Sequence, residues 1–250
     1  MKPWHEQDAF WEDLEGHLFS PARLEQTAGE VDQVLALAGV KPGATVLDLC
    51  CGPGRHSMEL AHRGFAVMGV DRTRRYVEEA RRNARARGLS SAQFSVADMR
   101  SFRQPDAFDL VINLFTSFGY FEDPADDRRV MDNVYASLRR GGRFLIDTHG
   151  KESLAARFRP RDWYEEDGAI FLEERVVSQD WGWIDSRWNR LQADRRSEFR
   201  VSHRLYSAVE LKRLARDAGF SEAVVFGALD GTPYDHRATR LVLLAAKGSA

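Results

Sequence analysis

The sequence has very little cysteine and no long apolar run. Its 250 residues include two cysteines, which are adjacent at Cys50 and Cys51. Adjacent cysteines do not easily bridge each other and lack the spacing of zinc ligands, so neither a disulfide framework nor a metal site is expected. The sequence contains no run of about 18 apolar residues, and its first residues have no apolar signal region. We therefore expect a cytoplasmic protein without a membrane partner.

The chain also lacks a charge excess of either sign. Its formal net charge is −2, which gives no global attraction to nucleic acid. The basic run at Arg81, Arg82, Arg85 and Arg87 falls on a predicted helix and is typical of a solvated face. With 43% hydrophobic and 30% charged residues, the chain suits one sizeable domain, with or without a small insertion.

A glycine-rich turn lies at the centre of the sequence pattern. The apolar run Val46 to Leu49 leads into Gly52 and Gly54, and the sequence then reads as a helix. Glycine permits unusual φ values and lets a ligand approach the main chain closely, so this turn predicts a small-molecule site. A dinucleotide fingerprint would place a third glycine where Ser57 stands.

Strands and helices alternate between Ala44 and Thr148. We expect strands at 45–49, 65–70, 93–96, 108–113 and 143–148, with helices at 57–63, 73–87 and 126–140. This alternation favours a parallel sheet with helices on both faces, and a ligand beyond the carboxyl ends of the strands. Five polar residues fall at such ends: Asp48, Asp71, Asp98, Asn113 and His149.

The pattern changes after Gly150. Residues 170–177, 181–188 and 197–206 read as antiparallel strands inserted after the fifth parallel strand, and a helix at 211–218 and strands at 224–226 and 240–245 follow. Residues 4–19 form an apolar helical face, either packed on the domain or acting as a lid. The predicted division is an N-terminal helical segment or lid at 1–40, a core at 41–150 and 207–250, and an inserted antiparallel β lid or substrate region at 151–206.

Four motifs in order carry a resemblance to a known family. They are D-x-x-x-G-x-G from Asp48 to Gly54, an acid at Asp71, the run Ala97-Asp98-Met99, and the strand that ends at Asn113. Together they resemble the class I S-adenosylmethionine-dependent methyltransferases, especially small-molecule glycine and sugar-amine N-methyltransferases. The resemblance implies an α/β fold: a doubly wound, Rossmann-like seven-stranded sheet with its last strand antiparallel, plus a small antiparallel β insertion after strand 5.

The same resemblance implies S-adenosylmethionine as cofactor, S-adenosylhomocysteine as product, and no metal. Asp71 would bind the ribose hydroxyls, as an acid would also do in a dinucleotide site. Asp98 and Met99 would contact the adenine. The full set of expected cofactor residues is Phe19, Arg23, Asp48, Cys50, Gly52, Gly54, His56, Asp71, Arg72, Asp98, Met99, Asn113 and Phe115.

The acceptor side is less specified by the sequence. His149 is a candidate general base and Tyr120 a candidate for orienting the acceptor, although a strand-capping histidine and a core aromatic would need no such roles. His203, on an apolar face, is interpreted as a core histidine. Substrate contacts are expected from Ser117, Arg204, Tyr206 and Tyr234.

These features predict a methyltransferase acting on nitrogen or oxygen of a small metabolite, with a homodimer through the inserted strands as a further expectation. Families that methylate base amines follow Asn or Asp with two prolines and an aromatic, whereas Asn113 precedes Leu114-Phe115-Thr116. An RNA methyltransferase and a non-catalytic cofactor-binding protein remain as alternatives. Ser57 and the Asp98 motif disfavour a nicotinamide dehydrogenase.

Overall fold

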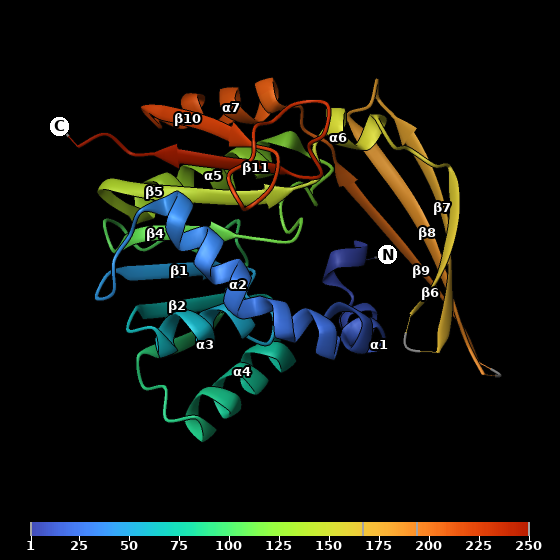
Figure 1. Cartoon of the computed structure of the whole chain (residues 1–250), viewed down its shortest axis with the longest axis horizontal. Helices are drawn as coiled ribbons and strands as arrows, with labels where there is room; N and C mark the ends of the chain where they lie inside the picture. Colours follow the sequence, from blue (N-terminus) through green and yellow to red (C-terminus); the bar gives the residue numbers. More distant parts are fainter. Residues whose placement is uncertain (1, 167, 194, 250) are drawn as a thin grey trace.

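Two β-sheets of different kinds make up the framework of the protein (Figure 1). The computed structural model describes residues 2–166, 168–193 and 195–249. The larger sheet has seven strands in the order β10-β11-β5-β4-β1-β2-β3, and the smaller has four in the order β6-β7-β8-β9.

The seven-stranded sheet is parallel except at its last strand. Strands β1 to β5 pair in parallel, whereas β11 runs antiparallel to both β5 and β10. This arrangement confirms the predicted α/β fold class. The strands are β1 (Thr45–Leu49), β2 (Ala66–Asp71), β3 (Ala92–Val96), β4 (Phe108–Asn113), β5 (Leu138–Thr148), β10 (Glu222–Phe226) and β11 (Leu241–Ala246).

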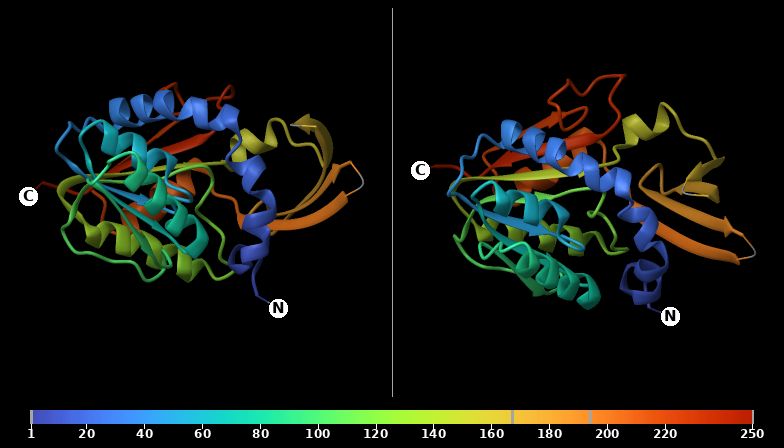
Figure 2. Two further views of the ribbon diagram at one scale, coloured as in Figure 1. Left: turned by 90° about the horizontal axis from the view of Figure 1, so that it is seen from below. Right: turned by 60° about the horizontal axis from the view of Figure 1, so that its bottom comes forward.

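Consecutive residues of the buried strands point to opposite faces of the sheet, so both faces present side chains that must be covered. Helices cover both of them. On one face, α2 (Pro21–Ala38) and α3 (Arg55–His62) pack on Val46 and its neighbours. On the other, α5 (Pro124–Ser137) and α7 (Ala208–Asp217) pack on the alternate residues. Figure 2 shows α2 and α3 on the side of the sheet opposite α5. The remaining helix of this layer, α4 (Arg74–Ala86), packs at the β3 edge.

The four-stranded antiparallel sheet is inserted between β5 and α7, at the strand-end edge of the core (Figure 1). It follows a short helix, α6 (Lys151–Ala155). Its strands are β6 (Arg161–Glu166), β7 (Ala169–Ser178), β8 (Trp183–Gln192) and β9 (Arg195–Arg204). Three of the four match predicted strands. The pattern missed β6, an edge strand that carries four charged residues and so has little apolar alternation.

An N-terminal lid segment, residues 4–18, lies between the strand ends of the core and the inserted sheet (Figure 1). It consists of η1 (Trp4–Glu6) and α1 (Asp8–Leu18) rather than one predicted helix, because Gln7 has an extended conformation. Phe10 and Leu14 pack in one apolar cluster with Phe171 and Phe199 of the inserted sheet. By contrast, α2 packs on the core and belongs to its layer structure.

The end of α5 also differs from the predicted boundary. The helix was expected to reach Arg140, but it ends at Ser137, and Leu138 takes an extended conformation and begins β5. The fifth strand is therefore five residues longer at its start than the expected 143–148. Local helix propensity is overridden here by pairing between Leu138 and Phe108 of β4.

Candidate active site

A cavity of about 700 Å³ lies where the strand ends, the lid segment and the inserted sheet meet. Its lining includes Asp48 and Asp71 from the core, Trp4 from the lid segment, and Trp188 and His203 from the inserted sheet. The cavity thus has the position at which open α/β sheets bind ligands and the size of a small-molecule pocket.

The glycine turn after β1 forms part of this cavity. Gly52 and Gly54 both have left-handed φ values, of 54° and 84°. A Cβ at Gly52 would lie 2.9 Å from Phe19, and one at Gly54 would lie 2.8 Å from the ring of Phe94. Neither position has room for a side chain, so both glycines are needed for the turn to keep this shape.

Asp71 holds the glycine turn in place. Its carboxylate accepts hydrogen bonds from the backbone N–H of Gly52 at 2.9 Å and of Thr73 at 2.7 Å. In the neighbouring strand, Asp48 accepts from the hydroxyl of Ser57 at 2.6 Å. Burial raises the pKa of both carboxyls above its usual value. These two acids connect β1, β2 and the start of α3 at the floor of the cavity.

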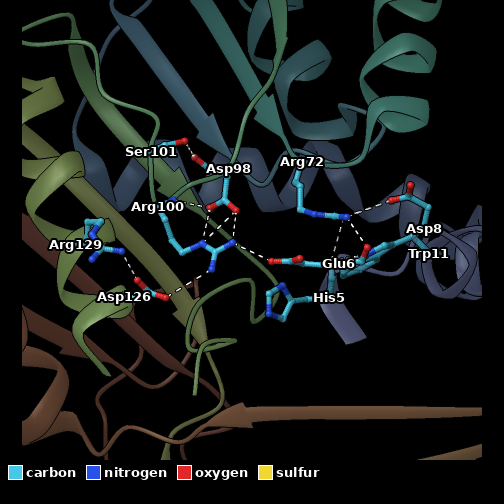
Figure 3. Close-up of polar contacts among 10 residues, drawn as sticks. All are labelled: His5, Glu6, Asp8, Trp11, Arg72, Asp98, Arg100, Ser101, Asp126 and Arg129. Atoms are coloured by element: carbon cyan, nitrogen blue, oxygen red, sulfur yellow. Dashed lines mark hydrogen bonds and ion pairs between the residues drawn. The ribbon is translucent and has the colours of Figure 1, made fainter. Parts of the chain in front are cut away.

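Asp98, beyond the end of β3, is held by a basic residue that the motif did not single out. Arg100 donates to both carboxylate oxygens, with Nε to Oδ1 at 3.0 Å and Nη2 to Oδ2 at 2.6 Å. Burial opposes ionisation, but the bonds from Arg100 outweigh it and keep the pKa of Asp98 below its usual value. Arg100 also donates to Glu6 of the lid segment at 2.9 Å, as Figure 3 shows.

A second arginine attaches the lid segment to the core. Arg72, directly after Asp71, donates to the carbonyl oxygens of His5 at 3.2 Å and Glu6 at 2.5 Å (Figure 3). On α4, the hydroxyl of Tyr76 donates to the carbonyl oxygen of Trp11 at 2.6 Å. The residues that surround the predicted cofactor site therefore also hold the lid segment over it.

The loop after β4 has an unusual backbone. Phe115 and Thr116 are consecutive non-glycine residues with left-handed φ values, of 57° and 59°. Asp147 supports this conformation, because its side chain accepts from the N–H of Phe115 at 3.1 Å and its carbonyl oxygen accepts from the N–H of Thr116 at 2.9 Å. Strained backbone of this kind tends to occur at functional sites, where surrounding contacts maintain it.

Arg240, which directly precedes β11, connects this loop to the predicted base. It forms a two-point ion pair with Asp147, at 2.6 and 2.9 Å, and donates to the hydroxyl of Thr116 at 3.0 Å. Its Nη1 lies 3.0 Å from Nε2 of His149. Burial, together with the charge of Arg240, lowers the pKa of His149 well below its usual value, so the ring is neutral at pH 7.

Most of the residues singled out from the sequence line this one cavity. Their roles remain predictions, because the structure gives their positions only. The residues in the lining are Phe19, Arg23, Asp48, Cys50, Gly52, His56, Asp71, Arg72, Asp98, Met99, Phe115, Ser117, Tyr120 and His149.

Several of these side chains already have partners within the protein. Nε2 of His56, expected at the cofactor carboxylate, lies 2.9 Å from Glu30. The hydroxyl of Ser117 donates to the carbonyl oxygen of Leu114 at 2.8 Å. Tyr120 packs against Trp4 and His5 of the lid segment, and burial raises its pKa. Tyr120 is therefore in contact with the cover of the cavity as well as with its interior.

Five predicted site residues are not part of the lining. Gly54 and Asn113 lie just beneath it, and the amide of Asn113 donates to the carbonyl oxygen of Leu49 at 3.0 Å. Tyr234 donates to Glu152 at 2.9 Å. Arg204 and Tyr206, expected to contact substrate, instead contact the buried Asp127, which accepts from Tyr206 at 2.6 Å.

The contacts of Arg204 and Tyr206 correct the expectation that they face the acceptor. The sequence placed both on the polar face of an inserted strand, but the chain leaves that strand at Arg204 and returns to the core. Burial raises the pKa of Asp127 to about 6, and Arg204 and Tyr206 surround it where the inserted sheet joins the core.

Sequence reasoning missed the cavity residues contributed by distant segments. These are chiefly Thr116, Trp188, His203 and Arg240, whereas Trp4 and His5 belong to the segment interpreted as a possible lid. One signal was available for Arg240: a final strand antiparallel to the fifth would begin at the edge where the fifth ends, so its first residues lie beside His149. The others depend on how the inserted sheet and the lid segment fold back over the core.

Within the described ranges, no group of three His, Cys, Asp or Glu side chains could hold a metal ion. Among the same residues, no helix has the length and apolar character of a membrane span.

Part of the chain matches a known protein family. Residues 46–142, which include the glycine turn, Asp71 and Asp98, match the family model described as a methyltransferase domain. The chain carries a methyltransferase domain. This match agrees with the family predicted from the motifs, and solved S-adenosylmethionine-dependent methyltransferases share the fold.

Solved structures extend the likeness of the methyltransferase domain to nearly the whole chain. An S-adenosylmethionine-dependent methyltransferase from Clostridium acetobutylicum aligns with a TM-score of 0.77 at 17% identity, over 96% of this chain and 98% of that one. The sugar N-methyltransferase KedS8 from Streptoalloteichus aligns with a TM-score of 0.70 at 23% identity, over 93% and 92%. At such identities the likeness shows the fold, including the inserted sheet.

One sequence relative is named as an RNA methyltransferase rather than as a small-molecule enzyme. A 23S rRNA (uracil(1939)-C(5))-methyltransferase of Alkalilimnicola ehrlichii is 41% identical over 174 residues, which cover 62% of this chain. The match spans 38% of the length of that relative.

Proposed function

We propose that the protein transfers a methyl group from S-adenosylmethionine to a nitrogen or oxygen of a small-molecule metabolite. The lid segment and the inserted sheet together form a cover over the carboxyl ends of the strands, and this cover is the observation that supports the proposal. The lid segment and the inserted sheet contribute Trp4, Trp11, Trp188 and His203 to the lining of the cavity, so cofactor and acceptor would share a space of about 700 Å³. A small metabolite meets that condition more readily than a folded RNA.

The lining residues suit the cofactor in shape and in charge. Neither glycine position on the turn has space for a Cβ. Asp71 lies at the end of β2, where its carboxylate could accept hydrogen bonds from ribose hydroxyls. Asp98 and Met99 lie along the same edge. When bound, S-adenosylmethionine supplies a methyl group that is already activated on a sulfonium centre.

The chain's own contribution is alignment and exclusion of water. The fixed loop at Phe115 and Thr116 lies between the acidic strand ends and His149, so it would set the approach of the acceptor. Alignment of reacting groups contributes about 7 to 11 kcal/mol in favourable cases. An amine that enters unprotonated needs no base, whereas a hydroxyl would need one, and neutral His149 is the cavity residue suited to that task.

RNA methylation is the second candidate, supported by the 41% identity to a part of the rRNA enzyme. Methylation at a uracil carbon requires a thiolate that adds to the ring, because the carbon is a weak nucleophile. The two cysteines of the chain, Cys50 and Cys51, lie beside the glycine turn, and burial raises the pKa of both thiols well above its usual value. Their environment therefore favours the small-molecule proposal.

The test is a methyl-transfer assay with two acceptor panels. Purified protein and S-adenosylmethionine are incubated either with small amines and hydroxy compounds or with rRNA fragments, and S-adenosylhomocysteine is measured. We expect product with a member of the small-molecule panel, none with Asp71→Ala, and unchanged turnover with the exposed control Asp106→Ala. Product formed only with RNA would refute the proposal, and cofactor binding without turnover on either panel would support a binding protein.

We also propose that two copies associate through the inserted strands. On the outer face of that sheet, Trp163 is 63% exposed and directly opposes Leu172, which is 41% exposed, while Val176 on β7 is 63% exposed. Exposed apolar side chains in a group are typical of contact surfaces. Light scattering should give a dimer mass for the wild type and a monomer mass for Trp163→Glu; a monomeric wild type would contradict this.

A further inference from the structure

A cluster of nitrogen-bearing side chains occupies the end of the cavity away from the glycine turn. Arg240 precedes β11, His149 follows β5, and His203 lies on β9 of the inserted sheet. All three line the cavity. Nη1 of Arg240 lies 3.0 Å from Nε2 and 3.4 Å from Nδ1 of His149. Three segments far apart in the chain therefore bring a guanidinium and two imidazoles together.

The guanidinium of Arg240 is fixed on one side and available on the other. Its Nε and Nη2 bind Asp147 and Thr116, and Asp147 is buried. Nη1 is directed toward His149 and has only that neutral ring as its partner among the described residues. A cationic donor with a neutral acceptor forms a weaker bond than it would with an anion.

The two histidines have unmet capacity to bind a ligand. Nε2 of His203 is buried and has no hydrogen-bond partner among the residues that the structure describes. Burial, then the charge of Arg240, lowers its pKa to about 4. For His149, the charges of Arg240, Arg157 and Arg175 act in the same direction as burial. The charges near the two rings are therefore mainly positive, with Asp147 paired to Arg240, and an anion there would stabilise the protonated form of both rings.

We propose that Arg240, His149 and His203 form a subsite that binds an oxyanion, a carboxylate or a phosphate group, carried by the methyl acceptor. This inference rests on the proposed methyl-transfer function, because it names the class of acceptor. The opposite end of the cavity carries Asp48, Asp71 and Asp98, whose carboxylates disfavour an anion beside them, although Arg23, Arg55 and Arg72 also line the cavity. Thr116, bonded to Arg240, is next to Phe115 in the loop that would set the approach of the acceptor.

The position of the subsite also has a consequence for His149. Its imidazole would be occupied by the anionic group rather than free to remove a proton from the reacting atom. An acceptor amine that enters unprotonated requires no such base. The subsite therefore favours an anionic amine, such as an amino acid or an amino sugar phosphate, over a neutral alcohol.

The test separates cofactor binding from anion binding. Calorimetry first measures S-adenosylmethionine binding to the wild type, Arg240→Met, His203→Phe and the exposed control Arg237→Met. A wild type that binds no cofactor would count against the proposed function, whereas the subsite is judged by the second arm. That arm uses protein loaded with S-adenosylhomocysteine and labelled at histidine, titrated with succinate, inorganic phosphate or neutral succinamide.

We expect succinate or phosphate to shift the ring resonances of His149 and His203, assigned with the variants, and succinamide to leave them in place. Arg240→Met and His203→Phe should each weaken anion binding about tenfold or more, and Arg237→Met by less than about twofold. Which anion binds more tightly tells carboxylate from phosphate. Wild-type resonances that move with neither anion would overturn the proposal. Unchanged anion affinity in His203→Phe would also overturn it, because Nε2 of His203 has no hydrogen-bond partner among the described residues that the substitution would remove. Arg23→Met, a substitution of another cavity arginine, is titrated in the same way: lost anion binding in this variant, with none lost in Arg240→Met, would place the anion elsewhere in the cavity and equally overturn the proposal.

Discussion

Along the edge of the sheet that borders the cavity, one half carries acids and the other carries bases. Asp48, Asp71 and Asp98 lie at or just beyond the ends of β1, β2 and β3, whereas His149 and Arg240 lie where β5 ends and β11 begins. In the acidic half, each functional side chain follows a strand in one continuous motif region. In the basic half, the partners come from segments about 90 residues apart, as in Arg240 and Asp147. The positions of the acidic residues therefore follow from local sequence, whereas the contacts of the basic residues depend on the topology of the sheet.

The largest effect should come from breaking the basic half. Arg240→Met leaves the carboxylate of Asp147, which is 3% exposed, without its ion-pair partner. Removing one partner of a buried pair costs about 3 to 5 kcal/mol, and we expect about 3 kcal/mol of lost unfolding free energy because Arg240 is partly exposed. Urea denaturation measures this. Arg237→Met, which removes an exposed pair with Asp235, should lose less than about 1 kcal/mol. Equal losses in the two variants would show that the Asp147 pair has no special weight.

The next effect should come from the acidic half and should affect ligand binding. Asp71→Asn keeps one oxygen for the N–H of Gly52, but it places its amide NH2 against the N–H of Thr73 and removes the charge that would face the ribose. Hydrogen bonds to charged groups contribute about 1.5 to 3 kcal/mol, so S-adenosylmethionine affinity should fall about 30-fold, and unfolding free energy should fall by about 1 to 3 kcal/mol because one backbone N–H loses its partner. Calorimetry measures it, with exposed Asp106→Asn as the control. Affinity equal to that of the wild type would remove Asp71 from the cofactor site.

A third effect distinguishes the halves by pH. The pKa of His203 is about 4 in the folded protein against 6.5 for an ordinary histidine, so the unfolded state binds more protons between these values. Stability is therefore fully present above about pH 6.5 and falls as the pH drops toward 4, by about 1 kcal/mol per pH unit at most from this residue. His203→Phe should reduce that slope in thermal unfolding curves from pH 4.5 to 7. The same slope in both proteins would show that His203 is solvated and that its pKa is not lowered by folding.

The smallest effect concerns the lid segment, which is attached on the acidic side. Glu6→Gln weakens its bond to Arg100, a pair in which both side chains are more than a quarter exposed, and should cost less than about 1 kcal/mol of unfolding free energy. Release of S-adenosylhomocysteine should nevertheless become several-fold faster in stopped-flow measurements, because the cover opens more often. Glu12→Gln, on the same segment but 3.9 Å from Arg75, serves as the control. Identical release rates in the two variants would mean that the cover does not control exit.

The sequence predicted the core and its acidic residues well because their signals are local. Alternating strands and helices, the glycine turn and the acids at strand ends depend on neighbours within a few residues. The predicted sheet, with its antiparallel last strand, agrees with the structure for this reason. Strand β6 was missed because a charged edge strand has no apolar alternation.

A possible lid and the position of His149 were predicted, but the contacts of the basic half were not, because they depend on tertiary structure. Arg204 and Tyr206 alternate on a strand as substrate contacts would, yet the buried Asp127 determines their position. His203 resembles a core histidine in sequence, but the cavity faces its side chain and its Nε2 has no partner among the described residues. Arg100 stands two residues after Asp98, and its bonds to both oxygens of that carboxylate depend on side-chain positions that the sequence does not give.

The proposed function depends first on whether the protein binds S-adenosylmethionine, and a titration decides this. S-adenosylmethionine and, in parallel, NAD are titrated calorimetrically into the folded wild type and into Asp71→Ala. The account predicts that the wild type binds S-adenosylmethionine and not NAD, and that the substitution weakens binding. A folded wild type that binds NAD in preference, or binds neither compound, would contradict it.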